Sequence, residues 1–106
     1  MAKYMIQAAY TTDGMKGLLK DGGSKRRSVV ESAIKALGGH VEAFYFSFGP
    51  NDVVIIVDLP DVVSGAAVGM AVGASGSVRS TTTPLITCEE IDQAAKKQVA
   101  YKAPGA

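Results

Sequence analysis

A chain of 106 residues with a hydrophobic fraction of 47% and a charged fraction of 20% has the composition of one soluble globular domain. Its formal net charge of +1 excludes the strongly basic surface typical of nucleic-acid-binding domains. The single cysteine, Cys88, has no partner for a disulfide within the chain, and the N-terminus lacks the apolar core of a signal peptide. We therefore expect a cytoplasmic protein whose fold does not depend on disulfides.

The first predicted strand is Tyr4–Tyr10, which is apolar and rich in β-forming residues. The polar segment that follows predicts a turn and a helix N-cap at Thr12 or Asp13. One or two helical turns come next and are interrupted at Gly22–Gly23. A longer helix is predicted from Ser24, since its apolar residues recur on one helical face, namely Val29, Val30, Ala33, Ile34 and Leu37.

Gly38–Gly39 ends that helix, and two strands are predicted after it, His40–Phe48 and Val53–Val57. The second of these strands is apolar on both faces, which is typical of a strand that is covered on both sides. The four residues Gly49–Asp52 between the strands fit a β-turn, with Pro50 at the second position and Asn51 in a left-handed conformation at the third.

An apolar helix that opens at Pro60–Asp61 is predicted to run to about Gly76, and residues 62–76 carry no charge. A membrane span needs about 20 apolar residues, and this segment is shorter and diluted by glycine and serine, so the pattern favours a buried helix of a soluble domain. Its glycines at every fourth position indicate close packing on the sheet or on another helix. We expect no association with membranes.

The last predicted strand, Val78–Thr83, is β-branched but polar and is followed by Pro84, which is typical of a sheet edge. Thr87 and Glu90 then form a capping box that begins a C-terminal helix. We expect residues 1–100 to form a single domain and residues 101–106 a flexible tail.

The order β-α-β-β-α-β plus a terminal helix predicts an α+β, ferredoxin-like fold with an antiparallel sheet in the order 4-1-3-2. Two helices cover only one face of such a sheet, yet the second and third strands are apolar on both faces. An uncovered apolar face of this kind normally marks an interface. The sequence therefore predicts a homodimer, or a higher homo-oligomer, in which two sheets pack face to face.

This topology brings three connections to one end of the domain, which forms a predicted polar rim. The candidate ligand-binding residues at that end are Thr12, Asp13, Arg26, Asn51, Asp52 and Arg79. Asp52 and Arg79 are two strand spacings apart, about 10 Å, so a structural ion pair and a direct ligand role are both open. The cations Lys25, Arg26 and Arg27 at a helix start form either a solvated basic surface or an anion site.

Two other residues of chemical interest carry no predicted site. His40 has no second histidine or cysteine nearby to complete a metal set, so no metal is expected. Cys88 lies beside Glu89 and Glu90, which disfavour a thiolate, while the helix N-terminus favours one. We expect no cofactor.

The ordered set of segments YMIQ, TTDG, ALGGHVEAFYFSFG, DVVIIVDLPD and GSVRSTTT resembles the GYD-domain family over roughly residues 3 to 90. The family is named for a stretch at the turn between the second and third strands, where Gly49 and Asp52 match and Asn51 replaces the tyrosine. The resemblance implies a place among dimeric α/β-barrel proteins, which include cofactor-free monooxygenases, isomerases and small-molecule-sensing domains. If the family tyrosine binds a ligand, this chain has lost that function or changed its ligand.

Three functions remain open on these grounds. The leading hypothesis is a dimeric domain that binds or senses a small anionic or apolar molecule between the sheet and the polar rim of Asn51, Asp52 and Arg79. The alternative is a cofactor-independent enzyme with Asp52 as general base or with Tyr10 or Tyr45 as proton donor. The third is a purely structural oligomerisation module.

Overall fold

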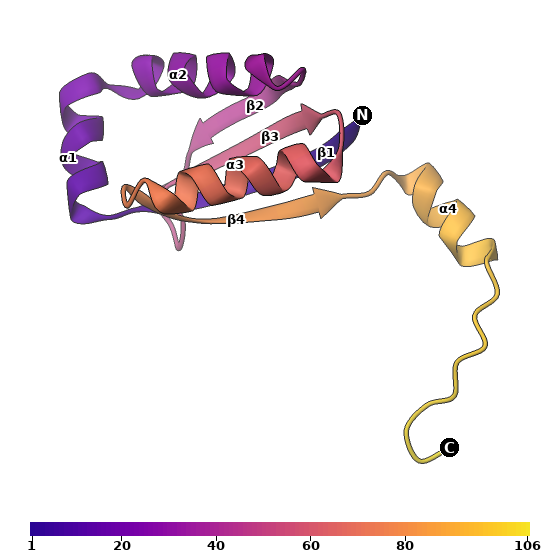
Figure 1. Cartoon of the computed structure of the whole chain (residues 1–106). Coiled ribbons are helices and arrows are strands. Elements are labelled where there is room, and N and C mark those ends of the chain that lie inside the picture. Colours follow the sequence, from indigo (N-terminus) through magenta and orange to yellow (C-terminus); the bar gives the residue numbers. More distant parts are fainter.

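A computed structural model describes all residues, 1–106, and has an α+β fold built on one four-stranded sheet (Figure 1). The elements in chain order are β1 (Ala2–Tyr10), α1 (Thr12–Asp21), α2 (Gly23–Ala36), β2 (His40–Phe46), β3 (Val53–Leu59), α3 (Val62–Ala74), β4 (Val78–Leu85) and α4 (Cys88–Lys96). The sheet order is β2-β3-β1-β4 and every neighbouring pair is antiparallel. This is the predicted 4-1-3-2 order read from the other edge, so the ferredoxin-like topology is confirmed.

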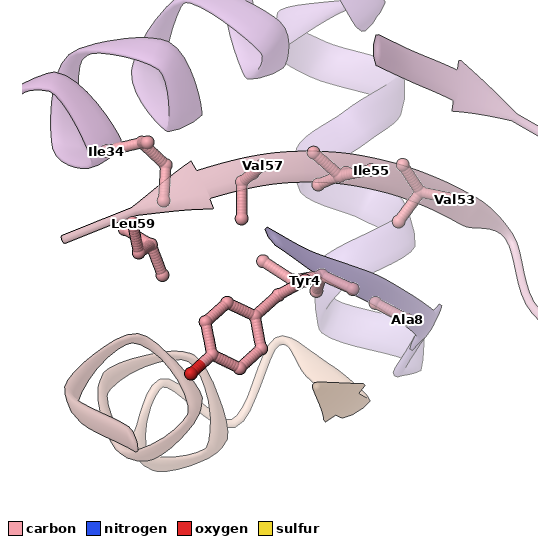
Figure 2. Packing of buried hydrophobic residues seen from close by; sticks show 8 residues of the cluster. Tyr4, Ala8, Ile34, Val53, Ile55, Val57 and Leu59 are labelled. Atoms are coloured by element: carbon pink, nitrogen blue, oxygen red, sulfur yellow. The ribbon is translucent and has the colours of Figure 1, made fainter. Parts of the chain in front are cut away.

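The two faces of the sheet differ because successive side chains of a strand point to opposite sides. In β1 and β3 one set of alternating residues is fully buried and forms the core together with Ile34 of α2 (Figure 2). The strand members of this core are Tyr4, Ile6, Ala8, Val53, Ile55, Val57 and Leu59. We call the side of the sheet that carries them the helix face, and the opposite side the open face.

Both long helices lie on the helix face, with α2 packed over β2 and α3 packed over β4. The approach of α3 is close at one glycine, since a Cβ atom on Gly65 would lie 3.0 Å from the ring of Tyr4. In Figure 2 the Tyr4 ring extends from β1 toward this helix. The glycine spacing predicted close packing on the sheet, and the structure gives that role to Gly65.

The helix α3 is less buried than its sequence predicts. Val63 and Met70 are 77% and 74% exposed, and Gly65 is the only fully buried residue of the helix. The expectation of a buried helix is therefore wrong for this chain, because a single sheet layer covers one side of α3 and nothing covers the other. No helix of the structure combines the length and hydropathy that a membrane crossing needs.

The start of α1 corrects one sequence prediction. The N-cap is Thr11 rather than Thr12 or Asp13, and its hydroxyl oxygen accepts a hydrogen bond from the Gly14 N–H at 3.2 Å. The same hydroxyl donates to the carbonyl of Gly76 at 3.0 Å. A contact with a distant segment thus decides which of three adjacent capping residues is used.

The connection between β2 and β3 also differs from the prediction. Strand β2 ends at Phe46, and Asn51 is not left-handed; Phe48 is the only residue other than glycine with a positive φ, at 49°. The Asn51 carbonyl accepts from the Ser47 hydroxyl at 2.8 Å and from the Gly49 N–H at 2.9 Å. These two bonds tighten the loop around Phe48, whose ring stacks on that of Phe46 with centroids 6.2 Å apart.

The C-terminal helix α4 and the residues after it stand away from the domain (Figure 1). The predicted capping box is confirmed, with the Thr87 hydroxyl and the Glu90 carboxylate each accepting the other's backbone N–H. The Cα radius of gyration is 16.8 Å, compared with about 13 Å for a compact domain of this length. All residues of α4 are exposed to solvent.

Candidate functional site

The predicted gathering of three connections at one end of the domain is present. The Thr11 N–H donates to the Ser77 carbonyl at 3.0 Å, which ties the start of α1 to the α3–β4 connection. On the other side of β1, the Asp52 N–H donates to the Ala8 carbonyl at 2.8 Å. The end of β1 is therefore held by the β2–β3 loop on one edge and by the α3–β4 loop on the other.

Asp52 has a structural partner at this end. One of its carboxylate oxygens accepts the backbone N–H of Tyr10 at 2.8 Å. This N–H lies where the β1–β3 ladder stops, since the last paired residues are Ala8 and Val53. The carboxylate thus replaces the next carbonyl of the ladder and satisfies a half-buried donor.

The Asp52–Arg79 ion pair, one of the two roles left open by the sequence, is absent. Asp52 directly precedes β3 and Arg79 lies in β4, on the two sides of the end of β1 as predicted, but the carboxylate is bound to backbone instead. Arg79 pairs with Ala9 in the sheet register and is exposed on the open face. Thr12 and Asp13 lie exposed in the first turn of α1, and no side-chain hydrogen bond engages them.

The three cations at the start of α2 have different surroundings. Lys25 pairs with Asp21 at 3.4 Å and Arg27 pairs with Glu31 at 3.8 Å, each one helical turn away. Arg26 is the half-buried member of the three and has no ion pair. Arg26 borders a hollow between the two long helices and the sheet.

This hollow, which we call the α2–α3 cavity, lies between α2, α3 and the helix face of the sheet and has a volume of about 490 Å³. It exists because α2 sits over β2 and α3 over β4, so the middle of the helix face is left without a covering helix. Alanine and valine side chains from both helices line the hollow. The lining residues are Ile6, Ala8, Tyr10, Arg26, Val29, Val30, Ala33, Ile34, Ala36, Leu37, Phe44, Val53, Ile55, Ala67, Val68, Ala71, Val72 and Val78.

The chemistry of the α2–α3 cavity is almost entirely apolar. Arg26 is its only charged residue, and Tyr10 is the only other lining residue with a polar side-chain atom. Of the six predicted ligand-binding residues, Arg26 alone lines the cavity. Sequence reasoning selected Arg26 from its place at a helix start and missed the apolar lining, because no local pattern reports the gap between two helices that are far apart in the chain.

The open face carries a second group of residues that sequence reasoning missed. The β2–β3 register places His40 opposite Asp58, and the His40 Nε2 atom lies 3.0 Å from the carboxylate. Lys3 of β1 lies 3.0 Å from the same carboxylate and also bonds Glu42. The pKa of Lys3 is raised above its ordinary value, first by the hydrogen bond to Glu42 and then by the one to Asp58. These charged residues lie in a row across three strands, and spacing along the sequence does not reveal the row because it depends on strand register.

Next to these charged residues, the centre of the open face around Ile56 is apolar. Ile56 lies between Met5 of β1 and Ala43 of β2 in the register, and Val54 lies between Gln7 and Tyr45. Tyr45 is 71% exposed, and no helix covers this side of the sheet.

The residues proposed for enzymatic chemistry do not share one pocket. The Asp52 carboxylate binds the Tyr10 backbone N–H, but only Tyr10 lines the α2–α3 cavity, and Tyr45 lies on the opposite face of the sheet. No three histidine, cysteine, aspartate or glutamate side chains are arranged to hold a metal ion. Cys88 is a free, exposed thiol at the start of α4.

Comparison with protein-family models gives one match, to the model described as GYD domain, over residues 4–95 of the 106-residue chain. The match includes the sheet except the first two residues of β1, the three helices α1 to α3 and most of α4. No curated protein and no solved structure matches the chain.

Proposed function

The chain belongs to the GYD-domain family, and from this premise we propose that it is a dimeric domain that binds a small molecule in the α2–α3 cavity. The observation that carries the proposal is the cavity itself. Its volume of about 490 Å³ lies within the range of about 300–1,000 Å³ found for small-molecule sites. Its composition, apolar with very few polar groups, is also that of such sites.

The position of the cavity beside the core supports a binding role. The cavity is open to solvent, since Val29 and Leu37 of its lining are 46% and 38% exposed, and apolar surface left in contact with water is unfavourable. Here the lining side chains of Ile6, Ile34 and Ile55 belong to the core, while Ala33 and Ala71 on the two helices leave the space unfilled. A ligand in this space completes the helix face of the sheet.

Dimerisation through the open face is the second part of the proposal. The isolated chain exposes 7388 Å², whereas a monomeric protein of 11.0 kDa exposes about 5,600 Å². The excess is about 1,800 Å² for one chain, roughly twice the 800 Å² that each partner buries in a standard interface. The C-terminal segment contributes part of it, and the apolar centre of the open face around Ile56 contributes a surface suited to a second copy. A reducing, cytoplasmic setting suits the exposed free thiol of Cys88.

The cavity is tested by filling it. We choose Ala71→Phe on α3, which lines the cavity, and Ala74→Phe at the exposed end of the same helix as a matched control. Binding is measured by calorimetry with two matched pairs of probes, 2-naphthoate with 2-naphthalenemethanol and octanoate with octanol. We expect at least one probe to bind the wild type and Ala74→Phe but not Ala71→Phe. Absence of binding by all four probes, or equal binding by both variants, contradicts the proposal.

The dimer is tested separately by light scattering on the full chain at micromolar concentration. The wild type is expected at twice the chain mass, and Ile56→Lys at the mass of one chain, because it buries a cation at the centre of the open face. Val63→Lys, which changes an exposed valine on α3, serves as the control and stays dimeric. A monomeric wild type contradicts the dimer without affecting the cavity.

A further inference from the structure

We infer that the ligand of the α2–α3 cavity is an apolar molecule with a single anionic group, such as a carboxylate, which binds the guanidinium of Arg26. This inference rests on the proposed function, since it names the chemical class of the ligand in the same cavity. It depends on three observations: Arg26 is alone among the cavity's charges, it lacks a partner, and the remaining lining is apolar.

The first step concerns the missing partner of Arg26. Its two neighbours in the chain, Lys25 and Arg27, each hold a carboxylate one turn away, so their charges are already compensated within the helix pair α1 and α2. Arg26 is half-buried and has no such carboxylate, and the first turn of α2 contains no acidic residue. A cation that is partly removed from water and unpaired is unfavourable, and an anion beside it relieves that cost.

The second step concerns the class of molecule that the rest of the cavity admits. Apart from Arg26 and Tyr10, the lining offers no side-chain hydrogen-bond donor or acceptor. A sugar, a nucleotide or a dicarboxylate brings several polar groups, most of which would lose water without gaining a partner there. A cationic ligand meets repulsion from Arg26. A ligand with an apolar body and one anionic end has a single charged group, and Arg26 pairs with it.

The third step sets this inference against the alternative for Arg26. Arginine also lays its aliphatic stem on apolar surface while its guanidinium stays in water, with no ligand involved. In that case the residue closes part of the cavity wall, and the charge of a ligand makes no difference to affinity. The two interpretations are separated by comparing ligands that share a body and differ only in charge.

The experiment measures the affinities of 2-naphthoate and 2-naphthalenemethanol, and of octanoate and octanol, for the wild type, Arg26→Gln and Arg27→Gln. We expect each carboxylate to bind the wild type at least about tenfold more tightly than its alcohol, the gain of a charge-assisted hydrogen bond. Arg26→Gln is expected to abolish that preference while leaving the affinity of the alcohol unchanged, which also shows that the cavity is intact. Arg27→Gln is the matched control and keeps the preference.

The outcomes distinguish this inference from the proposed function. If carboxylate and alcohol bind the wild type equally, the ligand class is wrong and the cavity remains a binding site. If the preference survives in Arg26→Gln, the anion is held by another cation and the role of Arg26 is wrong. If none of the four probes binds, both the inference and the proposed function fail.

Discussion

Because α1 packs closely against the α3–β4 loop, we predict that replacing Gly14 destabilises the fold. A Cβ atom at this position would lie 1.9 Å from the carbonyl oxygen of Ser77 and 3.0 Å from the ring of Tyr10. Gly17, one turn later in the same helix, has no atom within 4 Å of its would-be Cβ. Gly14→Ala and Gly17→Ala therefore make the same chemical change in two different surroundings.

The magnitudes follow from these distances. Carbon and oxygen atoms approach to about 3.3 Å, so Gly14→Ala requires α1 or the loop to move by roughly 1.4 Å. Such overpacking costs about 1–3 kcal/mol, and the move also strains the bond from the Thr11 N–H to the Ser77 carbonyl. The intrinsic gain of alanine over glycine in a helix, about 0.5–1 kcal/mol, offsets a part of this. We expect a net loss of up to roughly 2.5 kcal/mol for Gly14→Ala and a gain of about 0.5–1 kcal/mol for Gly17→Ala.

Thermal unfolding followed by circular dichroism checks both values. For a domain of this size the loss corresponds to a fall in Tm of up to roughly 20 °C for Gly14→Ala, with a rise of a few degrees for Gly17→Ala. Equal effects of the two substitutions would refute the reasoning, because helix propensity alone would then account for both. An increase in stability for Gly14→Ala would show that the α3–β4 loop does not rest on α1.

The remaining predictions concern two carboxylates. Asp52→Ala leaves the half-buried Tyr10 N–H without its acceptor, and we expect it to lower the free energy of unfolding in urea by about 1 kcal/mol. Asp52→Asn keeps a carbonyl oxygen as acceptor and should cost less. Equal losses for the two variants would contradict the role of this hydrogen bond. Asp61 accepts the Ser64 N–H at the start of α3, which lowers the pKa of Asp61 below its ordinary value of 3.8. Its stabilisation is therefore present above that value and lost as the pH falls through the lowered pKa. The stability of the wild type relative to Asp61→Asn should stay constant above the ordinary pKa value of 3.8 and decrease as the pH falls below it, and a difference that never changes would contradict the cap.

The sequence predicts the fold well because its signals are local and agree with one another. The apolar, β-forming residues of β1 and β3, the helical spacing of Val30 and Ile34, and right-handed connections together predict the sheet order that the structure has. Boundaries are less certain where neighbours have the same propensity. Thr11, Thr12 and Asp13 are all good N-cap residues, and the hydrogen bonds from Thr11 to the α3–β4 loop decide between them.

The candidate site is harder to predict because it depends on distances between separate elements. The polar rim follows from topology, and the structure does bring Asp52 to the end of β1. The partner of Asp52 does not follow, since a backbone N–H competes with Arg79 for the carboxylate. The α2–α3 cavity does not follow either, because its size is set by how far apart two helices pack on a shared sheet.

Isoleucine methyl groups test the central claim, binding in the α2–α3 cavity, most directly. Ile55 and Ile56 are adjacent in β3 and lie on opposite faces, so Ile55 lines the cavity while Ile56 lies on the open face. In a methyl-labelled NMR titration with 2-naphthoate, we predict shifts for Ile55, Ile6 and Ile34, and no shift for Ile56. A titration in which Ile56 shifts and Ile55 does not would place the ligand on the open face and contradict the account.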